Sequence, residues 1–176
     1  LEASSAASDV YKRQLVFPRP IGWISSLSKQ GIPNLAPYSY FNAVADEPPQ
    51  VMFCSNGDSA YGGFKDSLSN ILSTKEFVVN FATSTTRDAM NISSSNYKPN
   101  EDEFVAAKLK KRKSKLVKAP SVNDSPVNLE CRLLKTLKLK TNSKKLSTMV
   151  IGEVIGIYIN NKFCLLYTSD AADDAS

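Results

Sequence analysis

Two groups of polar residues could do chemistry in this chain, and the second of them suits the binding of an anion. The first lies along one extended run, where Asn34, Ser39 and Asn42 occupy positions that a buried strand would fill with apolar residues. The second is Lys65-Asp66-Ser67, at the expected start of a helix. A helix N-terminus offers unpaired N–H donors, and Lys65 adds a point charge. The second group could therefore bind a phosphate, but when each group is taken alone, outward-facing strand residues and an ordinary helix cap are the simpler explanation.

Several other chemistries are excluded by what the sequence lacks. Histidine is absent, which excludes Ser-His-Asp and Cys-His catalysis and imidazole metal ligands. Cys54, Cys131 and Cys164 are too few and too far apart for a zinc site or a disulfide framework. There is no glycine-rich loop of the Rossmann or P-loop type and no pair of acidic residues suited to acid–base catalysis. We expect reduced thiols in a cytoplasmic protein, with Cys54 buried and inert.

The two ends of the chain differ from its middle. Residues 1–14 and 164–176 are rich in small residues, and both resemble translated sequencing-adaptor sequence. We expect them to be non-native or disordered tails around one domain at 15–163, which would then be truncated at both ends and less stable than a longer relative. No apolar run approaches the roughly 20 residues that span a bilayer, so we expect no membrane segment.

The elements that must position the polar residues are mainly strands. We predict about six strands, at 21–27, 34–44, 50–55, 77–82, 127–134 and 148–159, and helices at 66–74, 85–93 and 100–109. The first two strands should pair as a hairpin, and Pro37 places the second at an edge or a bulge because proline cannot donate to the ladder. Asp66 or Ser67 is the expected cap of the first helix. This pattern favours a small barrel with short helices over a doubly wound sheet.

Several short motifs also occur in a characteristic order. Residues Pro18 to Ser26, PRPIGWISS, match the pattern P-R-P-I-x-W-[VI]-S-[ST], and Lys65-Asp66-Ser67 with Asn70-Ile71 matches K-D-T-x-x-N-I except for serine in place of threonine. Further segments follow in order at 34–44, 48–49, 77–80, 102–104, 125–127, 130–131 and 151–154. Together, from Val16 to about Phe163, they resemble the flavin-reductase-like family, the FMN-binding split-barrel group that includes flavoredoxin-type proteins. The resemblance implies a mainly β fold with short helices, a Greek-key split β-barrel.

The resemblance also implies a cofactor and the residues around it. FMN would lie near the interface of a homodimer, along six residues of the extended run: Asn34, Ala36, Pro37, Tyr38, Ser39 and Asn42. Ser39 and Lys65-Asp66-Ser67 would hold its phosphate, with Arg19 near the same pocket. Trp23 is expected in the core and not against the flavin. No side chain need act as acid or base, since the flavin carries the chemistry.

Two functions are compatible with such a flavoprotein. An oxidoreductase would transfer hydride from NADH or NADPH to FMN and pass electrons onward. A flavoredoxin-like carrier would need only an electron-acceptor protein. Nothing in the sequence marks a nicotinamide site, and we favour the enzyme.

A third candidate comes from the charge distribution. Residues 15–163 contain 20 basic and 12 acidic residues, and seven of the basic ones lie between Lys108 and Lys118 with no acid among them. Such a tract could bind a polyanion such as nucleic acid. It lacks aromatic residues for base stacking, so a solvated charged segment is the simpler explanation and we do not expect nucleic acid as a partner.

Overall fold

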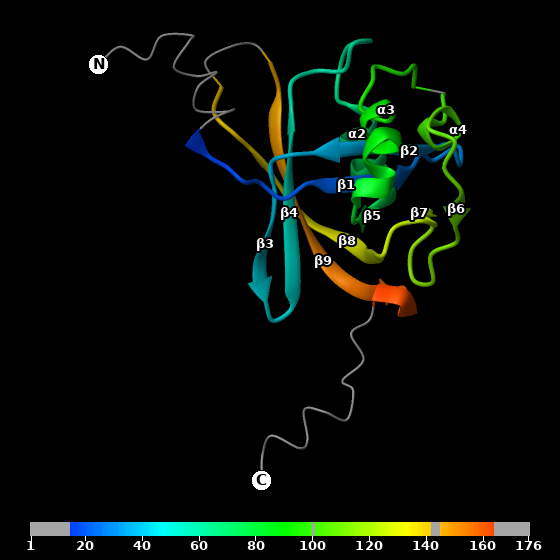
Figure 1. The fold of residues 1–176 in the computed structure, drawn as a ribbon. Coiled ribbons are helices and arrows are strands. Elements are labelled where there is room, and N and C mark those ends of the chain that lie inside the picture. The colour runs from blue at the N-terminus through cyan, green and yellow to red at the C-terminus, as the bar shows by residue number, and fades with distance from the viewer. Residues whose placement is uncertain (1–14, 100, 142–144, 164–176) are drawn as a thin grey trace.

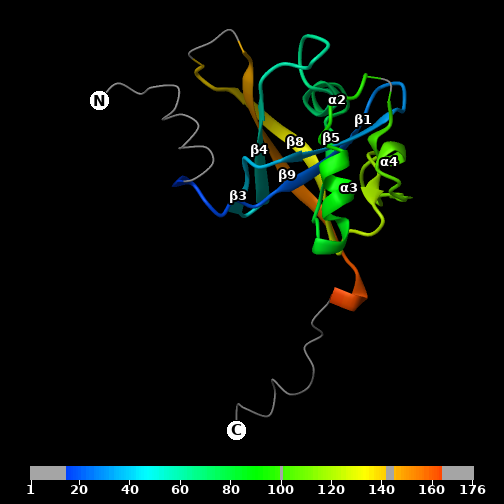
Figure 2. The same cartoon turned by 45° about the horizontal axis from the view of Figure 1, so that its top comes forward.

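A computed structural model describes residues 15–99, 101–141 and 145–163, so the expectations for residues 1–14 and 164–176 lie outside the described residues. Seven strands form one sheet: β1 (Gly22–Leu27), β2 (Pro33–Tyr38), β3 (Phe41–Asp46), β4 (Pro49–Asn56), β5 (Glu76–Asn80), β8 (Val127–Lys138) and β9 (Ser147–Ile159). A short ribbon pairs β6 (Lys111–Arg112) with β7 (Ser121–Val122). The helices are α2 (Asp66–Thr74), α3 (Arg87–Ile92) and α4 (Glu103–Ala106), with 3₁₀ turns η2 (Ser84–Thr86) and η3 (Asn161–Phe163). The predicted mainly β fold with short helices is confirmed, and the helices gather on one side of the sheet (Figure 1), as the turned view in Figure 2 also shows.

The two edge strands of the curled sheet, β2 and β3, are consecutive in the sequence. Its strand order is β2-β1-β5-β8-β9-β4-β3, with every pair antiparallel. The edge strands β2 and β3 are separated only by Ser39 and Tyr40. The Cys54 N–H donates to the Tyr40 carbonyl at 2.9 Å, which carries the β3–β4 ladder up to this bend. The chain therefore passes directly from one edge of an open barrel to the other.

The observed pairing of β2 and β3 corrects one prediction and confirms two others. The run expected at 34–44 as a single strand divides at residues 39–40, because its two halves pair with different neighbours at opposite edges of the sheet. The hairpin of β1 with β2 is confirmed. Pro37 lies in an edge strand, as predicted, where its missing N–H breaks no ladder on the outer side.

The expected helices are shorter than the sequence pattern indicated. The helix predicted at 85–93 is a 3₁₀ turn followed by the six residues of α3, and the one predicted at 100–109 is the four residues of α4. β8 is longer than expected, continuing to Lys138 along β9. None of the helices in the described part of the chain has the length and hydrophobicity that crossing a bilayer needs.

Buried side chains form separate clusters around β1. Ile24 packs with Phe53, Phe77 and Leu68 of α2 inside the barrel. Trp23, the next residue, packs in a second cluster that also contains Met90, Phe104 and Val122. Trp23 is fully buried and donates its indole N–H to the Ser93 hydroxyl at 2.9 Å, so its predicted place in the core is confirmed.

A buried asparagine fixes the centre of the sheet. Asn80 at the end of β5 is fully buried and donates to the Trp23 carbonyl at 2.9 Å and the Ser25 hydroxyl at 3.0 Å. Its carbonyl oxygen accepts from the Val122 N–H and the Asn128 amide. All the hydrogen-bonding capacity of the side chain is used, so Asn80 ties β5 to β1, β7 and β8.

We expect Gly152→Ala to destabilise the protein by about 1–3 kcal/mol, because a methyl group there would overpack the barrel interior. A Cβ on Gly152 would lie 2.4 Å from Cζ of the buried Phe77 ring and 3.3 Å from the Arg132 carbonyl oxygen. Urea unfolding measures the change. Gly156→Ala on the same strand is the control, since the close contact of its Cβ would be with Cδ1 at the end of the exposed Leu116 side chain, at 2.8 Å, while Cβ of Glu130 lies at an ordinary 3.6 Å. Equal losses for the two variants would contradict this explanation.

Candidate functional site

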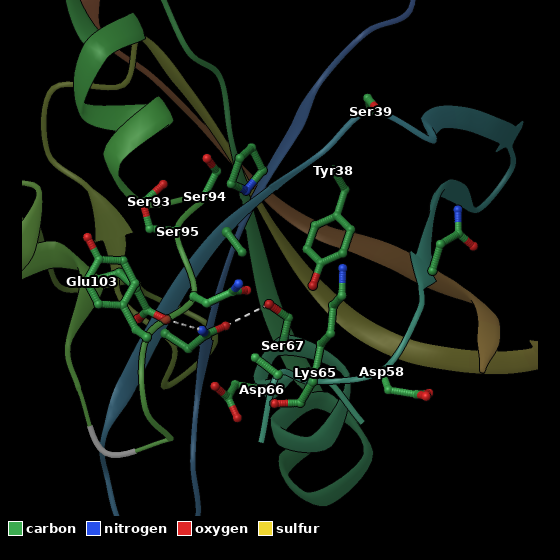
Figure 3. A pocket seen from close by; sticks show the side chains of 18 of the residues that line it. Tyr38, Ser39, Asp58, Lys65, Asp66, Ser67, Ser93, Ser94, Ser95 and Glu103 are labelled. Carbon is green, nitrogen blue, oxygen red and sulfur yellow. Dashed lines mark hydrogen bonds between the residues drawn. The ribbon is translucent and has the colours of Figure 1, made fainter. Parts of the chain in front are cut away.

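A pocket of about 310 Å³ opens beside β2 (Figure 3). Four segments contribute its walls: β2 with the bend after it, the loop from Asn56 to Ala60, the start of α2, and the loop from Ser93 to Tyr97. Cys54 of β4 and Glu103 of α4 complete the lining. Elements far apart in the sequence therefore meet at this one place.

Eight of the ten predicted site residues line this pocket: Asn34, Ala36, Pro37, Tyr38, Ser39, Lys65, Asp66 and Ser67. Asn42 does not line it; its exposed side chain accepts only from the Ala43 N–H. Arg19 also lies outside the lining, with its guanidinium 5.3 Å from the centre of the Tyr40 ring. Ser39 stands at the end of β2, apart from Lys65 and Ser67 (Figure 3).

The first turn of α2 faces the pocket without a side-chain cap. The predicted cap, Asp66 or Ser67, is wrong: both residues are already helical, and the N-cap position belongs to Lys65. A lysine side chain has no acceptor, and in the described part of the chain no side-chain bond caps this turn. The first N–H groups of α2 therefore have no side-chain cap among the described residues, and the Lys65 side chain extends from the N-cap position toward the phenol of Tyr38 (Figure 3). We call this feature the Lys65–Ser67 corner.

A chain of buried hydrogen bonds lies behind this corner. The Asn34 amide donates to Oε1 of Glu103 at 2.6 Å, and the Leu35 N–H donates to Oε2 at 3.2 Å. The Asn34 carbonyl oxygen accepts from the Ser67 hydroxyl at 2.6 Å (Figure 3). Ser67 is 1% exposed, so its hydroxyl supports Asn34 and is not turned outward to a ligand. A phosphate at this corner could accept a hydrogen bond from the Ser67 backbone N–H, but not from its hydroxyl.

The phenol of Tyr38 lies in the same buried layer. Burial raises the pKa of Tyr38 to about 12, against the opposite effect of the Ser67 and Ser55 hydroxyls. The phenol is therefore neutral at any ordinary pH.

Neither cysteine in the described part of the chain is set up for chemistry. Cys54 and Cys131 are buried free thiols, and burial raises the pKa of each. Cys54 was predicted to be buried, and this is confirmed, although it also lines the pocket. Cys164 lies outside the described residues. No cluster of possible metal ligands occurs among the residues described.

Besides the loop from Asn56 to Ala60, sequence reasoning missed two further parts of the pocket. One is the loop from Ser93 to Tyr97, whose serines and asparagine have the composition of any surface loop. The anchor that gives it a fixed place is the long-range bond from Trp23 to Ser93. The other is Glu103, which is 5% exposed. Its segment, residues 102–104, is one of the ordered motifs, but nothing local in the sequence indicates that a carboxylate beside Phe104 turns inward.

Glu103 should make stability depend on pH. Burial, aided by Asp66, raises the pKa of Glu103 from 4.5 to about 7 against its hydrogen bonds to Asn34 and Leu35. The folded state therefore binds the proton more tightly, so this contribution to stability is complete below pH 4.5 and is lost as pH rises through 7. We expect the unfolding free energy of the wild type, relative to Glu103→Gln, to fall by roughly 1–3 kcal/mol between pH 5 and 8. Urea unfolding across this range tests it, and parallel curves for the two proteins would contradict it.

The basic tract from Lys108 to Lys118 has structural partners of its own. Its backbone N–H groups at Lys115, Leu116 and Val117 donate to the buried Glu130 carboxylate at 2.9, 2.6 and 3.2 Å. Lys111 pairs with Asp102, and Arg112 stacks 3.4 Å from the centre of the Tyr158 ring. The tract, which includes β6, therefore wraps around the buried Glu130 side chain, and it does not line the pocket described above.

The sequence matches a protein family. The model of the flavin reductase like domain matches residues 13–176, so the chain belongs to this family, which includes NAD(P)H:flavin oxidoreductases. It is 47% identical over 122 residues to an uncharacterised protein of Aquifex aeolicus, covering 69% of this chain and 61% of that one. It is 35% identical over 149 residues to one of Deinococcus radiodurans, covering 82% and 63%. The chain thus spans less than two thirds of the length of these two relatives.

Solved structures agree with this assignment. Component B of nitrilotriacetate monooxygenase from Bacillus cereus superimposes with a TM-score of 0.83 at 29% identity, over 92% of this chain and 79% of that one. A split barrel domain protein of the flavin reductase type from Shewanella frigidimarina superimposes with a TM-score of 0.76 at 19% identity, over 92% and 81%. The predicted split-barrel fold and family are confirmed.

Proposed function

We propose that this chain binds FMN in the pocket beside β2 and works as an NAD(P)H-dependent flavin oxidoreductase. The observation that supports it most is the Lys65–Ser67 corner, where an uncapped helix N-terminus and a lysine meet at one wall of the pocket. This arrangement suits the phosphate of FMN. Membership of the flavin reductase like family supports the choice of a flavin.

The residues present fit the cofactor in chemistry, and the pocket has room for part of it. Ala36 and Pro37 present small or flat side chains on extended backbone, so a planar ring could approach β2 closely. A cavity of about 310 Å³ lies at the lower end of the range for ligand pockets. A molecule as large as FMN would extend beyond it. We therefore propose a homodimer in which the second subunit covers the remainder of the flavin.

The protein's own part in the reaction is binding and orientation. When bound, FMN would supply the chemistry, accepting hydride from NADH or NADPH and passing electrons to an acceptor. Lys65 and the N–H groups of α2 hold the phosphate, and the Glu103–Asn34–Ser67 bonds keep that corner in place. The neutral Tyr38 phenol adds no charge to the site.

The test is an FMN titration of purified protein followed by quenching of flavin fluorescence, with riboflavin as control. Saturable binding of FMN and much weaker binding of riboflavin are expected. Oxidation of NADH or NADPH by the loaded protein then separates the enzyme from a flavoredoxin-like carrier, which would bind FMN but require a protein partner for its electrons. A folded protein that binds no FMN would overturn the proposal.

Neutralising the basic tract should leave FMN binding intact. We expect the variant with Lys110, Lys113, Lys115 and Lys118 all changed to Gln to bind FMN within about threefold of wild type at 0.15 M salt, because exposed charges at a distance are screened. The fluorescence titration measures it. Loss of polyanion binding together with FMN binding in this variant would instead favour the tract as the functional site.

A further inference from the structure

We propose that Glu103 is a positioning residue of this pocket that takes up a proton when a phosphate-bearing ligand binds at the Lys65–Ser67 corner. The inference depends on the proposed function only for the identity of that ligand, FMN. It gives the buried Glu103 carboxyl group a role beyond its structural bond to Asn34.

The geometry isolates a carboxylate behind the corner. Glu103 is 5% exposed, and its oxygens accept from Asn34 at 2.6 Å and from the Leu35 N–H at 3.2 Å. Both donors are neutral. The ion pairs Arg87–Asp88 and Lys111–Asp102 do not include Glu103. A buried carboxylate with only neutral donors is sensitive to any further negative charge.

The charged and titratable groups near Glu103 do not offset such a charge. They are Asp66 and Lys65 from α2, Tyr38 from β2, Tyr97 from the 93–97 loop, and Asp102 with its partner Lys111 on the α4 side. Tyr38 is neutral, and Lys111 is engaged by Asp102. Asp66 already disfavours the Glu103 carboxylate. Lys65 is the cation that a bound phosphate would itself neutralise.

Protonation of Glu103 follows from this arrangement of charges. A phosphate monoester is dianionic above about pH 7. Its arrival favours the neutral form of Glu103, and a proton passes from the buffer to a carboxylate oxygen, forming one O–H bond. The other oxygen remains an acceptor for the Asn34 amide, so the Asn34–Ser67 bond that supports the corner is kept. Protonation thus removes the repulsion between the Glu103 carboxylate and the phosphate, and the hydrogen bonds that support the corner stay in place.

Calorimetry of FMN binding at pH 7.5, in Tris and in HEPES, measures this proton directly. We expect the wild type to take up roughly 0.5 proton per FMN, and its FMN affinity to fall about fivefold or more between pH 7 and 9. Glu103→Gln should show no uptake and a flat pH profile. Glu101→Gln, an exposed acid two residues earlier, is the matched control and should behave as wild type. Riboflavin should produce no uptake in any of them.

Each other outcome has a defined meaning. FMN binding without proton uptake, or with equal uptake in Glu103→Gln, would overturn the role of Glu103 and leave the proposed function standing. If Glu103→Gln does not fold, an infrared difference spectrum of wild type with and without FMN decides, since the protonated carboxyl must gain a C=O band. If FMN does not bind, the proposed function fails and inorganic phosphate becomes the probe: a gain of that band supports the inference, and no gain overturns it.

Discussion

Replacing Lys65 by alanine is expected to weaken FMN binding about tenfold to a hundredfold while leaving riboflavin binding nearly unchanged. The hydrogen bond of a charged donor to phosphate contributes about 1.5–3 kcal/mol, which corresponds to this range. The N–H groups of α2 remain in the variant, so binding is weakened and not abolished. Fluorescence titration of both flavins gives the two dissociation constants.

The control for this experiment lies on the same helix. Lys75 follows the last turn of α2 at the end far from the pocket, and it is exposed. Lys75→Gln removes the same charge and should bind FMN as wild type does. If Lys65→Ala and Lys75→Gln weaken binding equally, the effect of Lys65 is one of net charge and the phosphate assignment is wrong. A parallel loss of riboflavin affinity would likewise place Lys65 away from the phosphate.

Asn34→Ala is expected to destabilise the protein by about 2–4 kcal/mol, a large effect for one polar side chain. Asn34 is buried and joins three groups: it donates to Glu103 and accepts from Ser67 and Ser26. Removing it leaves the carboxylate with a single donor and two hydroxyls without their acceptor. The loss should be largest above pH 7, where Glu103 is ionised. Urea unfolding at pH 6 and pH 8 measures both values.

A double-mutant cycle separates this network from simple loss of packing. In a Glu103→Gln background, Asn34→Ala should cost about 1 kcal/mol less, because no buried charge is then left unpaired. Asn42→Ala is the matched control: this exposed asparagine bonds only to its neighbour, and the change should stay within about 0.5 kcal/mol. Strict additivity in the cycle would show that Asn34 and Glu103 are not energetically coupled.

The strands could be predicted because their local sequences and their burial agree. β1 and β5 are rich in β-branched and aromatic residues and are almost wholly buried, so their pattern leaves little choice. The bend at Ser39 could not be predicted, because extended residues on either side look alike and only their pairing partners differ. α4 fell short of its predicted length because the sequence after it turns at Lys108, with φ 54°, into the loop around Glu130.

The candidate site was predictable where its residues are neighbours in the sequence. Asn34 to Ser39 and Lys65 to Ser67 each form a compact motif, and the structure brings the two together. Glu103 and the serine loop could not be found in this way, because their position depends on contacts 68 to 70 residues away in the chain. At Ser67 the prediction and the structure differ in the role of one group. The sequence suggests that its hydroxyl donates to a ligand, but in the structure the hydroxyl donates to Asn34.

The strand order also determines when this barrel can be completed during folding. The hairpins β1–β2 and β3–β4 involve only residues 22–56 and can form early from local contacts. They are not neighbours in the finished sheet, since β5, β8 and β9 lie between them. β9, the last strand, pairs on both sides and makes the link between β8 and β4. On the ribosome, the two early hairpins must therefore wait for almost the whole described chain to emerge before the strand that unites them arrives.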